Sequence, residues 1–383
     1  MNIYIDENIP YAKEFFADLG TLHFFAGRTV TAEQIIDADI LLVRSITQVN
    51  EQLLSLNNSL KFVGTATIGT DHIDKSYLQS RAIAFSSAPG CNKISVAEYI
   101  LSSLLVLAEK QQFKLTDKSV AIVGAGNTGS AVFARLNALG VNCILYDPPL
   151  QLAGDRRTFC SFAEVLRADI ISLHVPKTEQ GQFATVHLFD ESVLKQLCSK
   201  QILLNASRGE VIDNKALLKL AQQGMIPTLV LDVWENEPTI NKDLLPFVEI
   251  ATPHIAGYSL EGKARGTEIL YLALCRFLMR TATHRLQEFV PLAAVNSVSI
   301  AQHLDQALLK SLVHLIFDVR RDDALFRQLI DQPDGFDTMR KTYQERRELS
   351  TLTVHSSVKQ NILLAALGFS IRALNEPKEK DEI

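Results

Sequence analysis

The stretch SVAIVGAGNTGSAVFARLNALG, residues 119–140, constrains the fold of this chain more than any other. An apolar run typical of a buried strand leads into three glycines in GxGxxG spacing, and a pattern typical of an amphipathic helix follows. Such glycines permit a tight turn, close approach of a diphosphate to the backbone, and close packing of the helix. The stretch therefore predicts a dinucleotide-binding βαβ unit. Its predicted cofactor-binding residues are Gly124, Gly126, Asn127, Thr128 and Gly129.

An acidic residue, Asp147, ends the next predicted strand, NCILYD, eighteen residues after Gly129. At this place an acidic side chain binds the adenosine ribose hydroxyls, and it would repel the 2′-phosphate of NADP. The residues that follow, PPL, contain no arginine to hold such a phosphate. NAD is therefore favoured as the cofactor, although an aspartate before Pro148 could also simply form a turn.

Short β-rich runs alternate with helical stretches in two series, one before residue 90 and one from residue 119 to residue 254. Nearly all-apolar strands in such alternation are typical of parallel sheets covered by helices on both faces. The fold class predicted is therefore α/β, with two doubly wound parallel-sheet domains, one flavodoxin-like and one Rossmann. The expected strands are residues 2–6, 21–25, 39–45, 61–67 and 83–87, then 119–124, 142–147, 169–175, 201–207, 228–234 and 249–254.

The pattern changes after residue 257. A helical stretch, residues 259–280, is a candidate return crossover to the first domain. Beyond residue 286, amphipathic segments (301–319 and 338–348) precede a β-like run and a charged tail, which indicates a separate α-rich module with a frayed end. The predicted domains are 1–93 with 258–285, 94–257, and 286–383.

Composition excludes several classes of protein. A net charge of −5 and a pI near 6.0 offer no positive surface for nucleic acid or an anionic membrane. The opening residues MNIYIDENIP lack a basic leader, and the most apolar stretch is interrupted by Glu98 and serines, so we expect a buried helix and a cytoplasmic protein. Five scattered cysteines without metal-ligand spacing predict reduced thiols and no metal.

Three later segments, LLNASRGEVIDNKAL, LDVWENEP and TPHIAGYS, each place polar residues just past a predicted buried strand. In open α/β sheets ligands bind at this edge. Arg208, Glu237 and His254 are the candidate functional residues there. Taken singly, such residues are more often a surface ion pair, a solvated loop residue and a packed side chain.

Together with the glycine turn, these segments resemble the signature motifs of the D-isomer-specific 2-hydroxyacid dehydrogenases, over roughly the first 285 residues. The resemblance implies a catalytic set in a cleft between a substrate domain and a nicotinamide domain. His254 would take the hydroxyl proton, Glu237 would orient its ring, and Arg208 would hold the carboxylate. The further cofactor-binding residues implied are Val175, Ala206, Ser207, Arg208, Asp232 and Gly257. Val175 could equally be an ordinary strand end, and Asp232 an ordinary strand carboxylate.

The runs LLVRSIT and GTATIGTDHID stand where the substrate loops of this family lie. Thr67 replaces a glycine common in the family, and Ser45 adds a second hydroxyl. Arg44 and Lys93 add positive charge suited to a polyhydroxy acid that ends in a phosphate, although either could equally form a surface ion pair. Tyr258 is a further candidate substrate contact.

The runs TPHIAGYSLEGKARGT and APGCNKISVAEY, with the C-terminal module, narrow the resemblance within the family. They imply NAD-dependent oxidation of 4-phospho-D-erythronate to (R)-3-hydroxy-2-oxo-4-phosphooxybutanoate, in the pathway to pyridoxal 5′-phosphate, by a homodimer joined through that module. Oxidation of another acid, such as 3-phosphoglycerate, stays open. So does an NAD-sensing corepressor-like protein, although the intact Arg/Glu/His set speaks against it.

Overall fold

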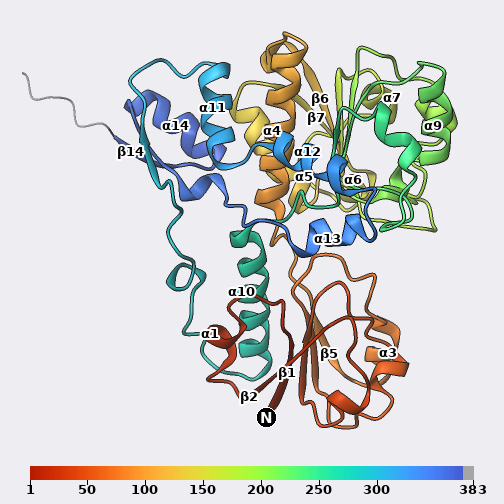
Figure 1. Cartoon of the computed structure of the whole chain (residues 1–383), viewed down its shortest axis with the longest axis vertical. Coiled ribbons are helices and arrows are strands. Elements are labelled where there is room, and N and C mark those ends of the chain that lie inside the picture. Colours follow the sequence, from red (N-terminus) through yellow and green to blue (C-terminus); the bar gives the residue numbers. More distant parts are fainter. Residues whose placement is uncertain (374–383) are drawn as a thin grey trace, which may run out of the picture. The chain divides into compact units, whose positions relative to one another are not determined.

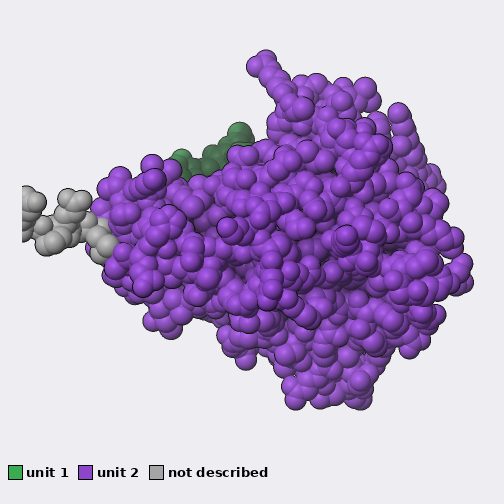
Figure 2. Space-filling model, turned by 90° about the horizontal axis from the view of Figure 1, so that it is seen from above, with its two compact units in different colours: residues 1–93, 258–291 green, residues 94–257, 292–383 purple. Residues whose placement is uncertain are grey.

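The computed structural model describes residues 1–373, and the charged tail expected at 375–383 lies outside them. The chain divides into two compact units, coloured separately in Figure 2. The first comprises residues 1–93 and 258–291, and the second comprises residues 94–257 and the chain from Leu292 onward. Each unit has its own sheet and core, and each is described here by itself.

The first unit contains a five-stranded parallel sheet in the order β2-β1-β3-β4-β5 (Figure 1). This is the strand order of flavodoxin-like folds, as predicted. Helix α10 (Leu260–Phe277) packs on the sheet, because Leu270, Tyr271 and Leu274 belong to the same buried cluster as strand residues such as Ile3. The strands are β1 (Asn2–Asp6), β2 (Thr21–Phe25), β3 (Ile40–Val43), β4 (Phe62–Thr65) and β5 (Ala84–Ser86), and the other helices are α1 (Ala12–Phe16), α2 (Glu51–Leu54) and α3 (Lys75–Ser80).

The second unit contains a six-stranded parallel sheet in the order β11-β10-β9-β8-β6-β7. The first strand, β6, pairs with β7 on one side and with β8 on the other, so the strand order reverses there. Ligands of open α/β sheets bind at such a switch point, outside the carboxyl ends of the strands. The strands are β6 (Ser119–Val123), β7 (Asn142–Tyr146), β8 (Ile170–Leu173), β9 (Ile202–Asn205), β10 (Thr228–Leu231) and β11 (Ile250–Ala251).

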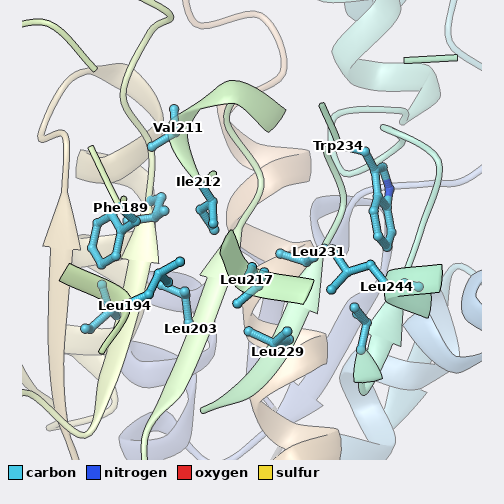
Figure 3. Packing of buried hydrophobic residues seen from close by; sticks show 14 of the residues in the cluster. Phe189, Leu194, Leu203, Val211, Ile212, Leu217, Leu229, Leu231, Trp234 and Leu244 are labelled. Carbon is cyan, nitrogen blue, oxygen red and sulfur yellow. The ribbon is translucent and has the colours of Figure 1, made fainter. Parts of the chain in front are cut away.

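Apolar side chains from one face of this sheet form a buried cluster with the segments that cover that face (Figure 3). Leu203 and Leu229 on the strands pack with Leu217 of α9 (Asn214–Gln222) and with Trp234. Full burial of each such side chain contributes roughly 1.5–3 kcal/mol relative to exposure. The remaining helices before residue 257 are α4 (Lys93–Lys110), α5 (Asn127–Ala138), α6 (Pro148–Leu152), α7 (Phe162–Val165) and α8 (Glu191–Leu194).

Helix α4 corresponds to the most apolar stretch of the sequence. Its residues 95–108 are all buried, including Glu98, as expected for a core helix. Among residues 1–373, no helix combines the length and the apolar character that a membrane crossing requires.

The C-terminal region shares the core of the second unit. Phe326 and Met339 belong to the same buried cluster as the Rossmann strands, and the Phe326 ring lies 6.1 Å from that of Trp234. Three strands form a parallel sheet here, of which the sequence pattern indicated one. The elements are β12 (Ser297–Ser299), α11 (Gln306–Ile316), α12 (Val319–Leu329), α13 (Gly335–Lys341), β13 (Thr353–Ser356), α14 (Val358–Leu367) and β14 (Ser370–Ala373).

The amphipathic segment expected over residues 338–348 ends early. Helix α13 stops at Lys341, and the charged residues that follow include Arg346 and Glu348, both buried. A run of charges in sequence therefore belongs partly to the interior of the second unit.

Candidate active site

Three neighbouring strands of the second unit place the candidate catalytic residues at one edge of the sheet. Strands β9, β10 and β11 pair side by side and in parallel, so their carboxyl ends lie at the same edge. Arg208 follows β9, Glu237 follows β10, and His254 follows β11. The three segments that each place a polar residue after a predicted strand are thus loops at a single edge of the sheet.

His254 and Glu237 are hydrogen-bonded to one another. His254 Nδ1 lies 2.7 Å from Glu237 Oε2, while Glu237 Oε1 accepts from the Trp234 amide at 2.8 Å. Burial raises the pKa of Glu237, but the positive charge and hydrogen bond of His254 and the Trp234 amide outweigh it, so the net pKa is lowered. Glu237 is therefore a carboxylate at neutral pH, and Nε2 is the remaining nitrogen of the His254 ring.

The loop of residues 252–257, the histidine loop, is fixed by the buried carboxylate of Asp232. Its Oδ1 accepts from Thr252 Oγ1 and the Ile255 amide, at 2.7 and 2.8 Å, and its Oδ2 accepts from the Ala256 amide at 3.0 Å. His254 itself has φ = 58°, in the left-handed region, which costs a non-glycine residue of order 1 kcal/mol or more. The bonds of Asp232 account for the persistence of that conformation.

Asp232 was expected to contact the cofactor. Its 1% exposure and its bonds to the histidine loop favour a role in holding that loop. Burial raises the pKa of Asp232 despite these hydrogen bonds and the nearby His254. Trp234, which the sequence did not single out, donates from its indole Nε1 to the Thr252 carbonyl at 2.9 Å and so ties the loop to the segment that carries Glu237.

The loop that carries Arg208 packs directly on the segment after β10. A Cβ added at Gly209 would lie 1.9 Å from the backbone carbonyl of Trp234, so only glycine fits there. The Arg208 side chain is half-buried, and its Nη1 donates to the Ser207 carbonyl at 2.8 Å. Ser207 in turn donates its hydroxyl to Asn205 Oδ1 at 2.8 Å. The backbone of the loop that carries Arg208 thus lies beside the segment that leads to Glu237.

The glycine turn fits a dinucleotide. Gly124 has φ = 91°, and a Cβ at Gly129 would lie 1.9 Å from the Gly124 carbonyl oxygen, so both positions require glycine for the fold itself. A Cβ at Gly126 would meet nothing within 4 Å, which leaves open space at the N-cap of α5. Asn127 and Thr128 begin that helix, whose N-terminal amides attract a diphosphate.

Asp147 lies against this turn. Its Oδ2 accepts from the Ala125 amide at 2.8 Å, and its Oδ1 caps α6 through the Leu150 amide at 3.0 Å. The carboxylate of Asp147 thus lies beside the glycine turn and also stabilises the turn at Pro148. A place at the cofactor site and a role in the turn, given above as alternatives, are compatible in this structure.

An arginine that was not predicted from the sequence to have a role, Arg157, lies near the glycine turn. Arg157 Nη1 donates to Ser130 Oγ of α5 at 2.8 Å. Its Nε and Nη2 bind both carboxylate oxygens of Asp155, at 2.9 and 2.7 Å. This pairing with Arg157 lowers the pKa of Asp155 to about 2, so the aspartate stays charged and offsets the cation. The positive charge of Arg157 is therefore balanced within the protein, which disfavours its use for a 2′-phosphate.

The remaining predicted cofactor residues lie at the same carboxyl edge. Val175 follows β8, Ala206 and Ser207 follow β9, and Gly257 ends the histidine loop. A Cβ at Gly124 would contact the His174 carbonyl and the Val175 amide, so the segment after β8 touches the glycine turn.

The predicted substrate residues belong to the first unit. Thr67 Oγ1 donates to the Gly69 carbonyl at 2.9 Å, and Arg44 Nη1 donates to the Asn8 carbonyl at 2.9 Å. Ser45 is exposed after β3, and Lys93 is the first residue of α4. These bonds orient Thr67 and Arg44 on the loops that follow β4 and β3.

Two basic residues without a predicted role lie on α10, also in the first unit. Lys263 Nζ stands 4.7 Å from the ring centroid of Tyr258, a cation–π contact. Arg265 donates to the Cys91 carbonyl, so it links α10 to the loop before Lys93. Lys263 thus positions the Tyr258 ring.

One group in the described part of the chain could offer three metal ligands: His187, Asp213 and Glu235. His187 Nε2 lies 2.6 Å from Glu235 Oε1, Glu235 Oε2 accepts from the Asn214 amide, and Asp213 caps α9. Hydrogen bonds within the protein account for this arrangement without an ion.

Comparison with known proteins agrees with this geometry. Residues 106–256 match the NAD binding domain of D-isomer specific 2-hydroxyacid dehydrogenases, and residues 289–368 match a domain of unknown function, DUF3410. In solved structures, the chain is similar to a D-lactate dehydrogenase from Aquifex aeolicus complexed with NAD and lactic acid. The TM-score is 0.59 and the identity 26%, over 73% of this chain and 96% of that one.

Two curated relatives extend over nearly the whole chain. An erythronate-4-phosphate dehydrogenase from Psychromonas ingrahamii is 72% identical, with 100% of both chains covered. A protein of the same name from Tolumonas auensis is 55% identical over 97% of this chain and 99% of its own. The similarity thus includes the C-terminal region as well as the site.

Proposed function

The chain belongs to the erythronate-4-phosphate dehydrogenases, within the D-isomer-specific 2-hydroxyacid dehydrogenase family, and from this premise we propose that it oxidises 4-phospho-D-erythronate at C2. The product is (R)-3-hydroxy-2-oxo-4-phosphooxybutanoate, in the pathway to pyridoxal 5′-phosphate. NAD is the cofactor. The observation that carries the proposal is the 2.7 Å bond between His254 and Glu237 at the edge of the sheet that also carries the glycine turn.

The proton leaves through His254. Its Nδ1 is bound to Glu237, so the Nε2 atom accepts the proton of the C2 hydroxyl while the C–O bond becomes a carbonyl. The Glu237 carboxylate stabilises the imidazolium formed and keeps the ring in one orientation. Arg208 offers a planar pair of donors to the substrate carboxylate. When bound, NAD supplies the acceptor for the hydride that leaves C2.

The glycine turn and Asp147 bind the cofactor. The open space at Gly126 admits the diphosphate against the start of α5, and Asp147 accepts hydrogen bonds from the adenosine ribose. Val175, Ala206, Ser207 and Gly257 complete the proposed set, and Asp232 acts through the histidine loop that it holds.

The first unit supplies the specificity. We assign the substrate hydroxyls to Ser45, Thr67 and Tyr258, and the phosphate to Arg44 and Lys93. The orientation of Arg44 by Asn8 and of Tyr258 by Lys263 supports this assignment, because an oriented donor loses less entropy on binding.

The test is formation of NADH, followed by its absorbance, with a panel of acids. We expect 4-phospho-D-erythronate to have the highest kcat/KM, well above D-erythronate, D-lactate and 3-phosphoglycerate. A higher kcat/KM for unphosphorylated erythronate would contradict the phosphate assignment. Absence of NADH with every acid, with NAD bound, would contradict the enzyme itself.

We also propose that the protein is a homodimer joined through its C-terminal region. Helix α14 exposes Val358 and Ile362, at 71% and 73%, and the neighbouring β14 is an edge strand of the three-stranded sheet. Exposed apolar side chains beside an open edge are typical of subunit contacts. Sedimentation should show a dimer for the wild type and for Leu152→Glu, which alters an apolar residue exposed elsewhere, and a monomer for Val358→Glu/Ile362→Glu. A dimeric double variant would contradict the proposal.

The cytoplasm is the compartment we propose. All five cysteines are free thiols in the structure, which suits a reducing environment.

A further inference from the structure

Arg346, in the C-terminal region, lies inside the second unit with 5% exposure. Its Nη1 donates to the carbonyl of Ala256 at 3.0 Å, and its Nη2 donates to the carbonyl of Ser95 at 2.6 Å. Burial of an arginine costs free energy that hydrogen bonds to its donors offset. The bonds to Ala256 and Ser95 therefore indicate the structural role of this side chain.

The two carbonyls belong to the histidine loop and to the start of helix α4. Ala256 is part of the histidine loop, two residues after His254, and Ser95 is in the first turn of α4. The chain passes between the two units after Lys93, after Gly257 and after Pro291. Arg346 therefore joins the second-unit ends of the first two passages.

The guanidinium has little freedom to move. Its central carbon stands 3.5 Å from the ring centroid of Phe317, and Nη2 lies 3.9 Å from Glu98 Oε2. A planar fork stacked on an aromatic ring can reach two carbonyls at once, which the single ammonium of lysine cannot do in the same geometry.

Ala256 is thereby held at both of its backbone groups. Asp232 Oδ2 accepts from its amide, and Arg346 donates to its carbonyl, each at 3.0 Å. Because Ala256 is buried, loss of the arginine would leave a carbonyl without a partner and favour a different path for the loop.

We propose that Arg346 is a positioning residue for the reaction, which fixes the histidine loop so that His254 meets Glu237. This inference rests on the proposed function of His254. It assigns to the C-terminal region a role in the chemistry of its own chain, in addition to any part in subunit contact.

Arg346→Lys is the variant that tests the proposal, and Arg135→Met is its matched control. Arg135 is also a buried cation near Glu98, with Nη2 at 3.9 Å from Glu98 Oε1, but it lies on α5 and donates to Ala131 in its own helix. Arg135→Met removes a positive charge near Glu98 and leaves the bonds of Ala256 in place. Arg346→Lys keeps the charge and loses the fork that binds the Ala256 and Ser95 carbonyls together.

We expect Arg346→Lys to lower kcat at least about tenfold while KM for the acid and Kd for NAD change less than about threefold. Arg135→Met should keep kcat within about threefold. Equal losses of kcat in the two variants, or a loss in Arg346→Lys that is confined to KM, would overturn the proposal.

Trp234, the single tryptophan, supplies a readout that does not depend on activity. Its indole binds the Thr252 carbonyl in the histidine loop, so its emission should shift in Arg346→Lys and stay unchanged in Arg135→Met. An unchanged emission in folded Arg346→Lys, checked by its thermal midpoint, would also overturn the proposal. If the wild type oxidises no acid, the proposed function fails, and the Trp234 emission still decides whether Arg346 fixes the loop.

Discussion

The Nδ1 atom of His254 lies 2.7 Å from the Oε2 atom of Glu237, and this bond joins the segments that follow the neighbouring strands β10 and β11. It leaves Nε2 to exchange a proton with substrate. Glu237→Gln keeps an acceptor of similar shape and removes the charge that stabilises the imidazolium. We expect kcat to fall by about 10- to 100-fold with a smaller change in KM, measured by NADH formation.

Glu235→Gln is the matched control for that variant. Glu235 also binds a histidine, His187, at 2.6 Å, but it does not contact His254 in this way. The kcat of Glu235→Gln should stay close to that of the wild type. A similar loss in both variants would show that the effect comes from the segment and not from the bond to His254.

His254→Gln should reduce kcat by roughly 10²–10⁴, because glutamine cannot accept the proton of the C2 hydroxyl. NADH formation measures this loss. His187→Gln, which alters a second histidine bound to a glutamate, should retain the rate of the wild type. An unchanged rate in His254→Gln would exclude His254 as the base.

Two glycines of the dinucleotide turn should respond differently to alanine. At Gly129 a Cβ would lie 1.9 Å from the Gly124 carbonyl oxygen, so Gly129→Ala should lower the free energy of unfolding by about 1–3 kcal/mol or more. At Gly126 a Cβ meets no protein atom within 4 Å, so Gly126→Ala should keep the thermal midpoint and weaken NAD binding. Normal NAD affinity in Gly126→Ala would place the diphosphate elsewhere.

Local patterns in the sequence were enough to predict both parallel sheets. Continuous apolar runs such as residues 202–204 indicate strands of a sheet whose two faces are both covered. The glycine spacing and the polar residues after three successive strands predicted an edge at which His254 and Glu237 indeed meet. Roles inferred for single residues of the first unit, such as Thr67 and Lys93, stay predictions.

The partners that hold the site could not be predicted in this way. Arg346 is about ninety residues from Ala256 and lies in a charged run that resembles a solvated surface, yet it is buried. Its role depends on a contact between distant segments, for which local periodicity carries no signal. Trp234 could have been noticed in the sequence, since it is the single tryptophan and lies within LDVWENEP. Its bond to Thr252 depends on the fold and has no signal in the sequence.

Glu98 should make stability depend on pH. Burial and the neighbouring Glu348 raise its pKa from an ordinary 4.5 to about 8, so the folded protein holds a proton there that the unfolded chain loses. Stability that is present below pH 4.5 is then lost as the pH rises to about 8, by at most about 1.4 kcal/mol per pH unit. Unfolding midpoints between pH 5 and about 8 should show this trend in the wild type and in Glu109→Gln, an exposed residue of the same helix, but not in Glu98→Gln. The same slope in Glu98→Gln would assign the proton to another group.

Cofactor choice should depend on the charge of Asp147. Because its Oδ1 caps α6, Asp147→Asn is a better test than alanine: asparagine also caps helices, and the variant loses only the charge that repels a 2′-phosphate. We expect the ratio of kcat/KM for NAD to that for NADP to fall at least about tenfold, since one charged hydrogen bond and one repulsion change together.

The control for cofactor choice is Asp190→Asn, because Asp190 caps α8 in the same manner and has no bond to the glycine turn among those described. Its ratio should equal that of the wild type. The pairing of Arg157 with Asp155 limits the gain for NADP, so Asp147→Asn/Asp155→Asn should gain more than the single variant. An unchanged ratio in both Asp147 variants would place the ribose away from this carboxylate.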